Sequence, residues 1–272
     1  MKQRIISAVV LLAIFIPILI IGKIPYAILM TILAWMSLYE MLKVRKTKKD
    51  FPIFMQVLSY LLVMFFVITN YSLTKSVVLD TLAFYVDYRI IAVFLFAFIT
   101  PIVIINDNKK YNLNDALFLV GSTLFIGLSF SLLILIRNMS LSYIIYLFLI
   151  STMTDTFALF TGKRIGKNKL APKISPNKTI EGSIGGSIMG TIVASVYLIE
   201  SGVVNGGTLP IVIMTLILTV IGQIGDLVFS AIKRYYDTKD FSNLIPGHGG
   251  ILDRLDSIIF IVLGFLLFLS IL

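Results

Sequence analysis

The chain of 272 residues has no cysteine and a single histidine, His248. Without cysteine it can form neither a disulfide framework nor a thiolate-ligated metal site. Charge is also scarce, since 14% of the residues are charged and 58% are hydrophobic, whereas soluble domains average roughly 25% charged residues. No internal repeat or low-complexity segment is evident. These absences exclude an ordinary soluble domain and indicate an integral membrane protein.

Long apolar runs are what the chain has instead, each close to the roughly 17–25 residues that a helix needs to cross a bilayer. Their continuity, without alternation of polar and apolar residues, excludes membrane-spanning strands. The sequence therefore predicts an all-α, polytopic transmembrane protein with about nine spans. We place these spans at residues 5–22, 24–42, 53–70, 89–106, 116–136, 141–161, 180–200, 209–229 and 257–272.

The first run follows Lys2 and Arg4, an arrangement also typical of a secretory signal peptide. No small-residue cleavage site follows, and Gly22 to Pro25 lead directly into the next apolar run. The first two spans are thus expected to form a tight helical hairpin.

The distribution of basic residues predicts the orientation. With the N-terminus in the cytoplasm, 19 of the 23 Lys and Arg residues fall in cytoplasmic segments. This asymmetry follows the positive-inside rule and places the C-terminus on the opposite side. The cluster at 43–50 is interpreted as a topology signal that also contacts lipid headgroups.

We expect one membrane domain, residues 1–272, in the cell membrane. Its N-terminal spans, 1–150, carry little site chemistry. The catalytic half, 151–272, contains two cytoplasmic loops, 162–179 and 230–256. The net charge of +9 favours anionic lipids over nucleic acid, because no basic soluble domain is present to hold a nucleic acid.

Three carboxylates gather near the second loop. Asp253 and Asp256 are spaced i and i+3 and share a helix face, where they repel unless a cation lies between them. Asp226 ends an apolar run, a position where a carboxylate is costly and usually paired or functional. Oxygen ligands suit a hard cation such as Mg²⁺. Salt bridges to Lys233, Arg234 and Arg254 are the alternative.

The first loop is basic and rich in glycine. Its lysines offer charge to phosphates, while Ser175 and Thr179 offer directional donors. The stretch from Ser175 to Glu181 has the pattern of a helix start, with a polar cap followed by an acid in the first turn. An ordinary positive-inside loop explains the composition equally well.

Two further features have both a functional and a structural interpretation. His248 lies among the glycines of Pro246–Gly250 and is a candidate for phosphate contact or proton transfer. Asp155, beside Thr154 and Thr156, could bind substrate or pair with the basic loop. By contrast, Gly182, Gly186 and Gly190 recur every four residues, which favours close packing of helices.

On these residues the chain closely resembles the phosphatidate cytidylyltransferase (CDP-diacylglycerol synthase) family. The C-terminal signature of that family is matched by Ser230, Lys233, Arg234, Lys239, Asp240, Pro246, His248, Gly249, Gly250, Asp253, Arg254 and Asp256. A second region of the family is matched by Asp155, Gly162, Lys163, Gly166, Lys167, Pro172, Ser175, Pro176, Lys178, Thr179, Glu181 and Gly182. Asn177 departs from the pattern, since many members have lysine there.

The resemblance implies an enzyme that condenses CTP with phosphatidic acid, on the cytoplasmic face, to give CDP-diacylglycerol and pyrophosphate. It implies Mg²⁺, with a monovalent cation such as K⁺ in the same site, and a homodimer. The implied metal ligands are Asp226, Asp253 and Asp256. The implied catalytic residues are Lys178, Lys233, Arg234, His248 and Arg254. The implied substrate-binding residues are Asp155, Lys167, Ser175, Lys178, Thr179, Glu181, Ser230, Lys239, Gly249 and Gly250.

Three other functions fit a polytopic protein. A secondary transporter of an anionic substrate would place its charges near the midplane, often in broken helices of repeated halves. A CDP-alcohol phosphotransferase would carry an Asp-Gly-x-x-Ala-Arg signature, which this sequence lacks. A non-enzymatic lipid-binding protein would gain nothing from clustered carboxylates, since they repel anionic headgroups.

Overall fold

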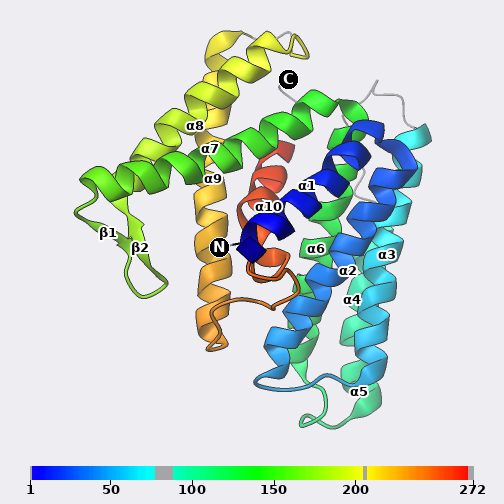
Figure 1. Cartoon of the computed structure of the whole chain (residues 1–272). Coiled ribbons are helices and arrows are strands. Elements are labelled where there is room, and N and C mark those ends of the chain that lie inside the picture. Colours follow the sequence, from blue (N-terminus) through cyan, green and yellow to red (C-terminus); the bar gives the residue numbers. More distant parts are fainter. Residues whose placement is uncertain (1, 77–87, 205–206, 269–272) are drawn as a thin grey trace. The chain divides into compact units, whose positions relative to one another are not determined.

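A computed structural model describes residues 2–76, 88–204 and 207–268, and most of these residues are helical (Figure 1). The helices are α1 (Lys2–Ile21), α2 (Lys23–Lys46), α3 (Ile53–Ser76), α4 (Tyr88–Ile99), α5 (Pro101–Ile105), α6 (Leu113–Met139), α7 (Leu141–Ile165), α8 (Ile180–Glu200), α9 (Thr208–Tyr235) and α10 (Leu252–Leu266). Two short strands, β1 (Lys169–Ala171) and β2 (Ser175–Thr179), lie between α7 and α8.

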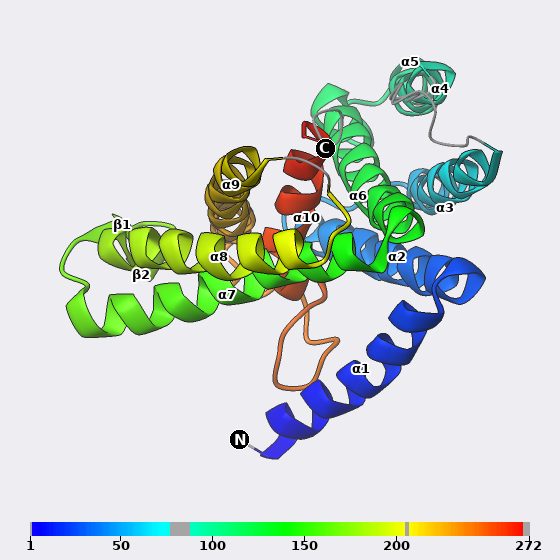
Figure 2. The same ribbon diagram turned by 90° about the horizontal axis from the view of Figure 1, so that it is seen from above.

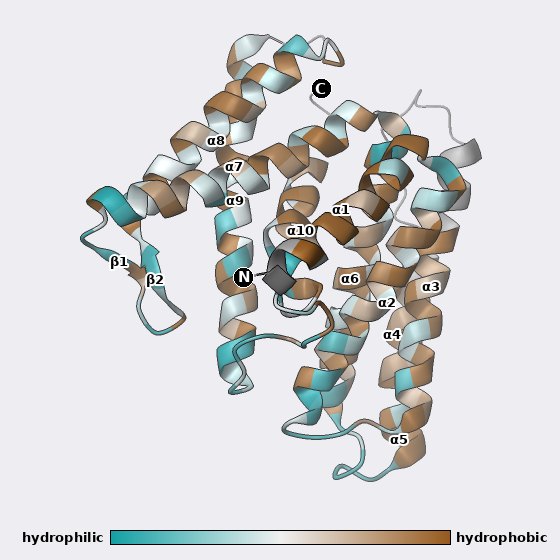
Figure 3. Cartoon of the chain, in the orientation of Figure 1, coloured by the Kyte–Doolittle hydropathy of each residue, from teal (hydrophilic) through white to brown (hydrophobic). Residues whose placement is uncertain are grey.

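The predicted apolar runs coincide with these helices. Within the described residues, α2, α6, α7, α8 and α9 are long and apolar enough to cross a membrane. Shorter apolar stretches occupy α1, α3 and the pair α4–α5. Hydrophobic residues cover the helices, while hydrophilic ones concentrate in the β hairpin and the loops (Figure 3). The count of nine spans and the placement of the termini stay predictions.

Some boundaries differ from the predicted ones for identifiable reasons. The run predicted at 89–106 is divided into α4 and α5 at Pro101, which has no amide hydrogen to donate to the carbonyl of Ala97. The last helix begins at Leu252, earlier than the predicted start at 257, and residues 269–272 of that run lie outside the described part. The turn between α1 and α2 is reduced to Gly22, whose φ of 66° suits glycine.

The all-α prediction missed the β hairpin. Strands β1 and β2 pair antiparallel, with Lys169 opposite Thr179 and Ala171 opposite Ser175. Strands of three and five residues, rich in lysine and proline, show none of the alternation by which a strand is recognised in a sequence. The hairpin places part of the basic loop in a defined backbone conformation.

The chain forms two compact units. The first unit comprises residues 1–135 together with 241–251, and the second comprises residues 136–240 and 252–272. The polar segment 230–256 thus contributes to both units. The prediction that residues 151–272 form a catalytic half stays a prediction.

In the first unit, a buried acid joins α2 to α6. Asp115 is fully buried, and its carboxylate accepts from Arg45 Nη2 at 2.8 Å and forms a second ion pair with Lys49. Its Oδ2 also accepts from the backbone amide of Asn112 at 3.1 Å. A buried carboxylate needs such partners, because its desolvation is costly. Two cations of the 43–50 cluster therefore stabilise the fold in addition to any role in topology.

In the second unit, α7 and α8 lie side by side, as do α9 and α10 (Figures 1 and 2). Glycines permit the close approach of α7 and α8. A Cβ atom at Gly186 would lie 2.6 Å from the carbonyl oxygen of Thr154 and 2.8 Å from the Cβ of Ala158. The predicted packing role of the glycines at 182, 186 and 190 is confirmed.

We expect Gly186→Ala to lower the free energy of unfolding by about 1–3 kcal/mol, the usual cost of overpacking a tight interface. The backbone of α7 cannot move away without disturbing the rest of the pair. Gly121→Ala is the matched control, because a Cβ atom there meets nothing within 4 Å and alanine favours the helix. Thermal unfolding in detergent would compare the two variants. Equal midpoints would contradict the packing role.

Candidate active site

The hairpin brings a lysine to an aspartate of α9. Lys178, on β2, forms an ion pair with Oδ2 of Asp226, and the two side chains are 26% and 24% exposed. Ser230, one turn further along α9, donates to Oδ1 of Asp226 at 3.3 Å. Three residues singled out in the sequence thus lie together. The partial exposure of Lys178 and Asp226 leaves this ion pair open to an incoming anion.

Asp226 belongs to a group of three carboxylates supplied by three helices. We call Asp155 of α7, Asp226 of α9 and Asp256 of α10 the aspartate cluster. The charge of Asp256 interacts with those of Asp226 and Asp155, and the charge of Asp155 interacts with that of Asp226. Like charges in one site disfavour each other's ionisation unless positive charge offsets them. Lys178 and Lys233 supply some of that charge.

Asp253 has different surroundings from Asp256, although both lie in the first turns of α10. Its Oδ1 accepts from Lys233 Nζ at 2.7 Å, and the two side chains are only 4% and 10% exposed. This is a buried ion pair, in which the loss of either partner leaves an uncompensated charge. The salt-bridge interpretation therefore holds for Asp253 and Lys233 as the structure stands.

The carboxylates of this site are of the type that binds a hard cation, but they are not grouped closely enough here to hold one. Among the described residues, no three or more Asp, Glu or His side chains are grouped closely enough to hold a metal ion. Two ammonium groups, those of Lys178 and Lys233, neutralise Asp226 and Asp253 instead. The available donors are carboxylate oxygens, which Mg²⁺ prefers. A cation that binds Asp226 would compete with Lys178.

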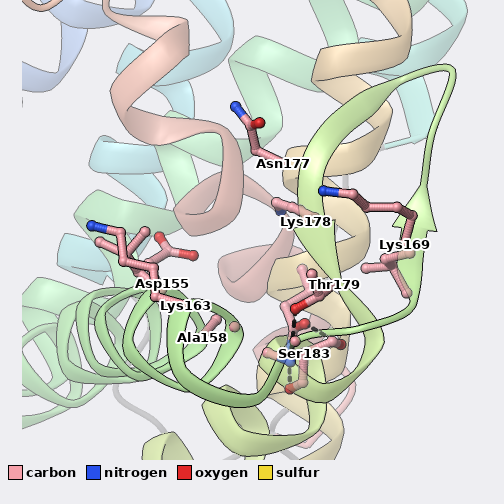
Figure 4. A pocket seen from close by; sticks show the side chains of 14 residues that line it. Asp155, Ala158, Lys163, Lys169, Asn177, Lys178, Thr179 and Ser183 are labelled. Carbon is pink, nitrogen blue, oxygen red and sulfur yellow. Dashed lines mark hydrogen bonds between the residues drawn. The ribbon is translucent and has the colours of Figure 1, made fainter.

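A cavity of about 310 Å³ lies between α7, the hairpin and α8 (Figure 4). Its volume is at the lower end of the roughly 300–1,000 Å³ typical of small-molecule sites. Asp155 and Lys163 line it from α7, and Lys169 and Lys178 line it from the hairpin. One acid and three lysines around a partly apolar pocket suit a ligand that carries both phosphate and less polar groups.

Gln223 is a polar residue of the cavity lining that was not expected from the sequence. Gln223, on α9, is buried, donates to Ser187 Oγ at 2.7 Å and accepts from the hydroxyl of Ser183. These contacts connect α9 to α8 beside the cavity. An amide within an apolar run, three residues before Asp226, was the signal that could have identified it.

The loop between α7 and α8 is ordered by two predicted substrate-binding residues. Glu181 accepts from the backbone amides of Lys167 and Asn168, each at 3.1 Å. Thr179 caps α8 by accepting from the amide of Gly182 at 3.1 Å, which identifies the polar cap expected between Ser175 and Glu181. Thr179 also lines the cavity, whereas Lys167 is exposed and Ser175 begins β2. Glu181 therefore acts on the loop backbone in this structure.

The remaining basic candidates lie at the ends of α9 and α10. Arg234 donates to the carbonyl oxygens of Ile174 at 3.3 Å and Thr238 at 3.0 Å, which ties the hairpin turn to the end of α9. Lys239 follows α9 in an exposed loop, and Arg254 is exposed in the first turn of α10. Exposure leaves these side chains accessible to phosphates.

The segment 241–251, which we call the histidine loop, belongs to the first unit. Two backbone hydrogen bonds close the loop. The amide of Ile245 donates to the carbonyl of Gly249, and the amide of His248 donates to the carbonyl of Ile245, both at 2.9 Å. Gly247 and Gly249 have φ angles of 78° and 84°, a region that favours glycine. Gly250, a predicted substrate contact, packs against the carboxyl group of Glu40.

His248 is itself held by α1. The hydroxyl of Ser7 donates to the carbonyl of Pro246 at 3.0 Å and lies 2.9 Å from Nδ1 of His248. A serine hydroxyl has one proton, and Ser7 donates it to the carbonyl oxygen of Pro246. The Ser7 oxygen therefore accepts from Nδ1–H of His248. Nδ1 is thus used for Ser7, so a hydrogen bond from His248 to a phosphate oxygen would come from Nε2–H.

Comparison with known proteins agrees with the resemblance. The profile described as the cytidylyltransferase family matches residues 2–272. A phosphatidate cytidylyltransferase of Bacillus subtilis (strain 168) is 37% identical over 278 residues, covering 99% of this chain and 97% of the relative. One from Staphylococcus aureus (strain COL) is 35% identical over 265 residues, covering 96% of each chain.

Proposed function

The chain belongs to the cytidylyltransferase family, and we propose that it transfers a cytidylyl group from CTP to phosphatidic acid. The products are CDP-diacylglycerol and pyrophosphate, and the reaction serves phospholipid synthesis in the cell membrane. Relatives at 34–37% identity over nearly the whole chain bear the name of this activity. We propose further that the site faces the cytoplasm, where CTP is found.

The aspartate cluster and its two lysines are the observation that supports this reaction best. Both substrates are anions, so their mutual repulsion is the main obstacle to reaction. A site with concentrated, opposed charges can offset it if a cation and the lysines lie against the phosphates. Lys178 beside the cavity, next to Asp226, provides one such charge.

We propose Asp226, Asp253 and Asp256 as ligands of Mg²⁺, with K⁺ as a second cation of the same site. Their oxygens are the donors that both cations accept. Bound there, Mg²⁺ supplies Lewis-acid charge at the phosphates that react and leave. Asp155, which interacts with Asp226 and Asp256, adds negative charge that attracts a cation.

The residues of the chain orient the two anions. We propose that Lys178 turns from Asp226 to the triphosphate when CTP enters, while Lys233, Arg234 and Arg254 contact phosphate oxygens. An oxygen of the phosphatidate phosphate attacks the α-phosphorus of CTP in line and forms the new P–O bond. The bond to the β-phosphate breaks, and pyrophosphate leaves with its electron pair. A phosphate monoester is largely ionised at neutral pH, so no strong base is needed.

Pyrophosphate release by the purified protein tests this function. CTP, phosphatidic acid and Mg²⁺ would be supplied together and then omitted one at a time, with radiolabelled cytidine followed into the lipid phase. Release that requires all three, and that stops completely with a chelator, would support the transferase. A folded protein that releases none would favour the transporter of an anionic substrate, which need not depend on a divalent cation.

His248 is expected to matter without being essential. Of the two roles considered for it from the sequence, phosphate contact and proton transfer, we keep the first, because the ionised phosphate needs no base. His248→Ala should therefore lower kcat/KM by about tenfold to a hundredfold, the loss of one charge-assisted hydrogen bond of about 1.5–3 kcal/mol. Steady-state kinetics with both substrates would measure it. Total loss in a folded variant would assign His248 an obligatory part.

A further inference from the structure

A single oxygen of Glu40 holds both ends of the histidine loop. Oε1 accepts from the hydroxyl of Ser242 at 2.6 Å and from the backbone amide of Ile251 at 2.8 Å. Ser242 in turn accepts from the amide of Leu244 at 3.2 Å. Glu40 lies on α2, more than 200 positions earlier in the chain. The loop is thereby fastened to a helix of the N-terminal spans at its first and last turns.

The burial of Glu40 indicates that this contact is more than incidental. Its side chain is fully buried, and a carboxylate in such a place is costly unless hydrogen bonds satisfy it. A Cβ atom at Gly250 would lie 2.5–2.7 Å from the three atoms of the Glu40 carboxyl group. A side chain at position 250 would therefore force the Glu40 carboxyl group to shift, which would disturb its bonds to Ser242 and Ile251.

We propose that Glu40 is a positioning residue that fixes the histidine loop for nucleotidyl transfer. The two fastened ends, together with the internal bonds of Ile245 and His248, leave the backbone from 242 to 251 little freedom. Ser7 holds the middle of the loop at Pro246 and His248. The inference rests on the proposed function for its effect on turnover, but the anchoring itself does not.

Three variants separate anchoring from simple packing. Glu40→Ala removes the acceptor, Glu40→Gln keeps an oxygen that can accept both bonds, and Ser37→Ala is the matched control on the same helix. Ser37 is buried like Glu40, and its hydroxyl has no hydrogen-bond partner in the part of the chain that the structure describes. Its loss should leave the histidine loop unchanged.

Hydrogen exchange measured by mass spectrometry, without substrate, tests whether Glu40 anchors the histidine loop. In Glu40→Ala the peptide covering 241–251 should exchange faster, while peptides of α7 and α8 keep their wild-type rates. Glu40→Gln should stay close to wild type. Unchanged exchange of 241–251 in a folded Glu40→Ala protein would overturn the proposal.

Steady-state kinetics then tests whether this anchoring matters for turnover. A displacement of about 1 Å can lower the rate about a hundredfold, so Glu40→Ala should lose kcat to that order and Glu40→Gln should regain most of it. A faster-exchanging loop with wild-type kcat and KM would overturn positioning. If the wild-type protein itself releases no pyrophosphate, the proposed function fails, and exchange alone decides whether Glu40 anchors the loop.

Discussion

Asp256→Asn is expected to abolish turnover, with a loss of about a thousandfold or more, as for removal of a group that holds catalytic charge. The substitution removes one carboxyl group from the aspartate cluster and keeps the size of the side chain. Its remaining oxygen can still accept from the amide of Ser257, which now donates to Asp256 Oδ1 at 2.8 Å. The start of α10 should therefore survive, so that the defect lies in cation binding.

The measurement is kcat across a Mg²⁺ titration, with monodispersity in detergent as the test of folding. Asp237→Asn is the matched control, since Asp237 is an exposed acid of the same polar segment with a φ of 55°, an angle that asparagine tolerates. It should retain wild-type activity. If Asp256→Asn turned over normally at saturating Mg²⁺, Asp256 would not be a ligand.

Lys178→Ala is expected to lower kcat/KM by about a hundredfold, mainly through a higher KM for CTP, because one positive charge toward the triphosphate is lost. The same change frees Asp226 from its ion pair. Apparent affinity for Mg²⁺ should then stay equal or increase. The opposite directions of the two effects distinguish a phosphate contact from a general disturbance of the site.

Steady-state kinetics with each substrate varied, at several Mg²⁺ concentrations, would measure both effects. Lys173→Ala is the control, because Lys173 is an exposed lysine in the turn of the same hairpin. Unchanged constants for both CTP and phosphatidic acid in Lys178→Ala would rule out its assignment. A matching loss in Lys173→Ala would attribute the effect to net charge.

The helices could be predicted because apolar runs of membrane length are long, continuous signals. The start of α8 at Ile180 agrees with the predicted apolar run 180–200, and the polar stretch before it indicated a helix start, whose cap the structure assigns to Thr179. The break at Pro101 was readable in principle, since proline has no amide hydrogen. The hairpin was not, because its pairing joins short strands whose residues carry no periodic pattern.

The types of residue in the site could be predicted from the sequence, but the ion pairs between them could not. Spacing placed Asp253 and Asp256 on one turn of a helix, but it could not assign Lys233 to Asp253 rather than to Asp256. Nothing in the sequence marked Glu40 as functional, since it is a single acid in a long apolar helix. Its partners follow some two hundred residues later, a separation at which local patterns carry no information.

The contact between Glu40 and Gly250 links two distant positions in inheritance. A lineage that replaced Gly250 by alanine would place a methyl group within 2.5–2.7 Å of the Glu40 carboxyl atoms. Such a lineage would have to displace the Glu40 carboxyl group or shorten residue 40, and either change would disturb the acceptor of Ser242 and Ile251. We therefore expect substitutions at positions 40 and 250 to be coupled in evolution. Helix α2 would then share the evolutionary constraint on the polar segment 230–256.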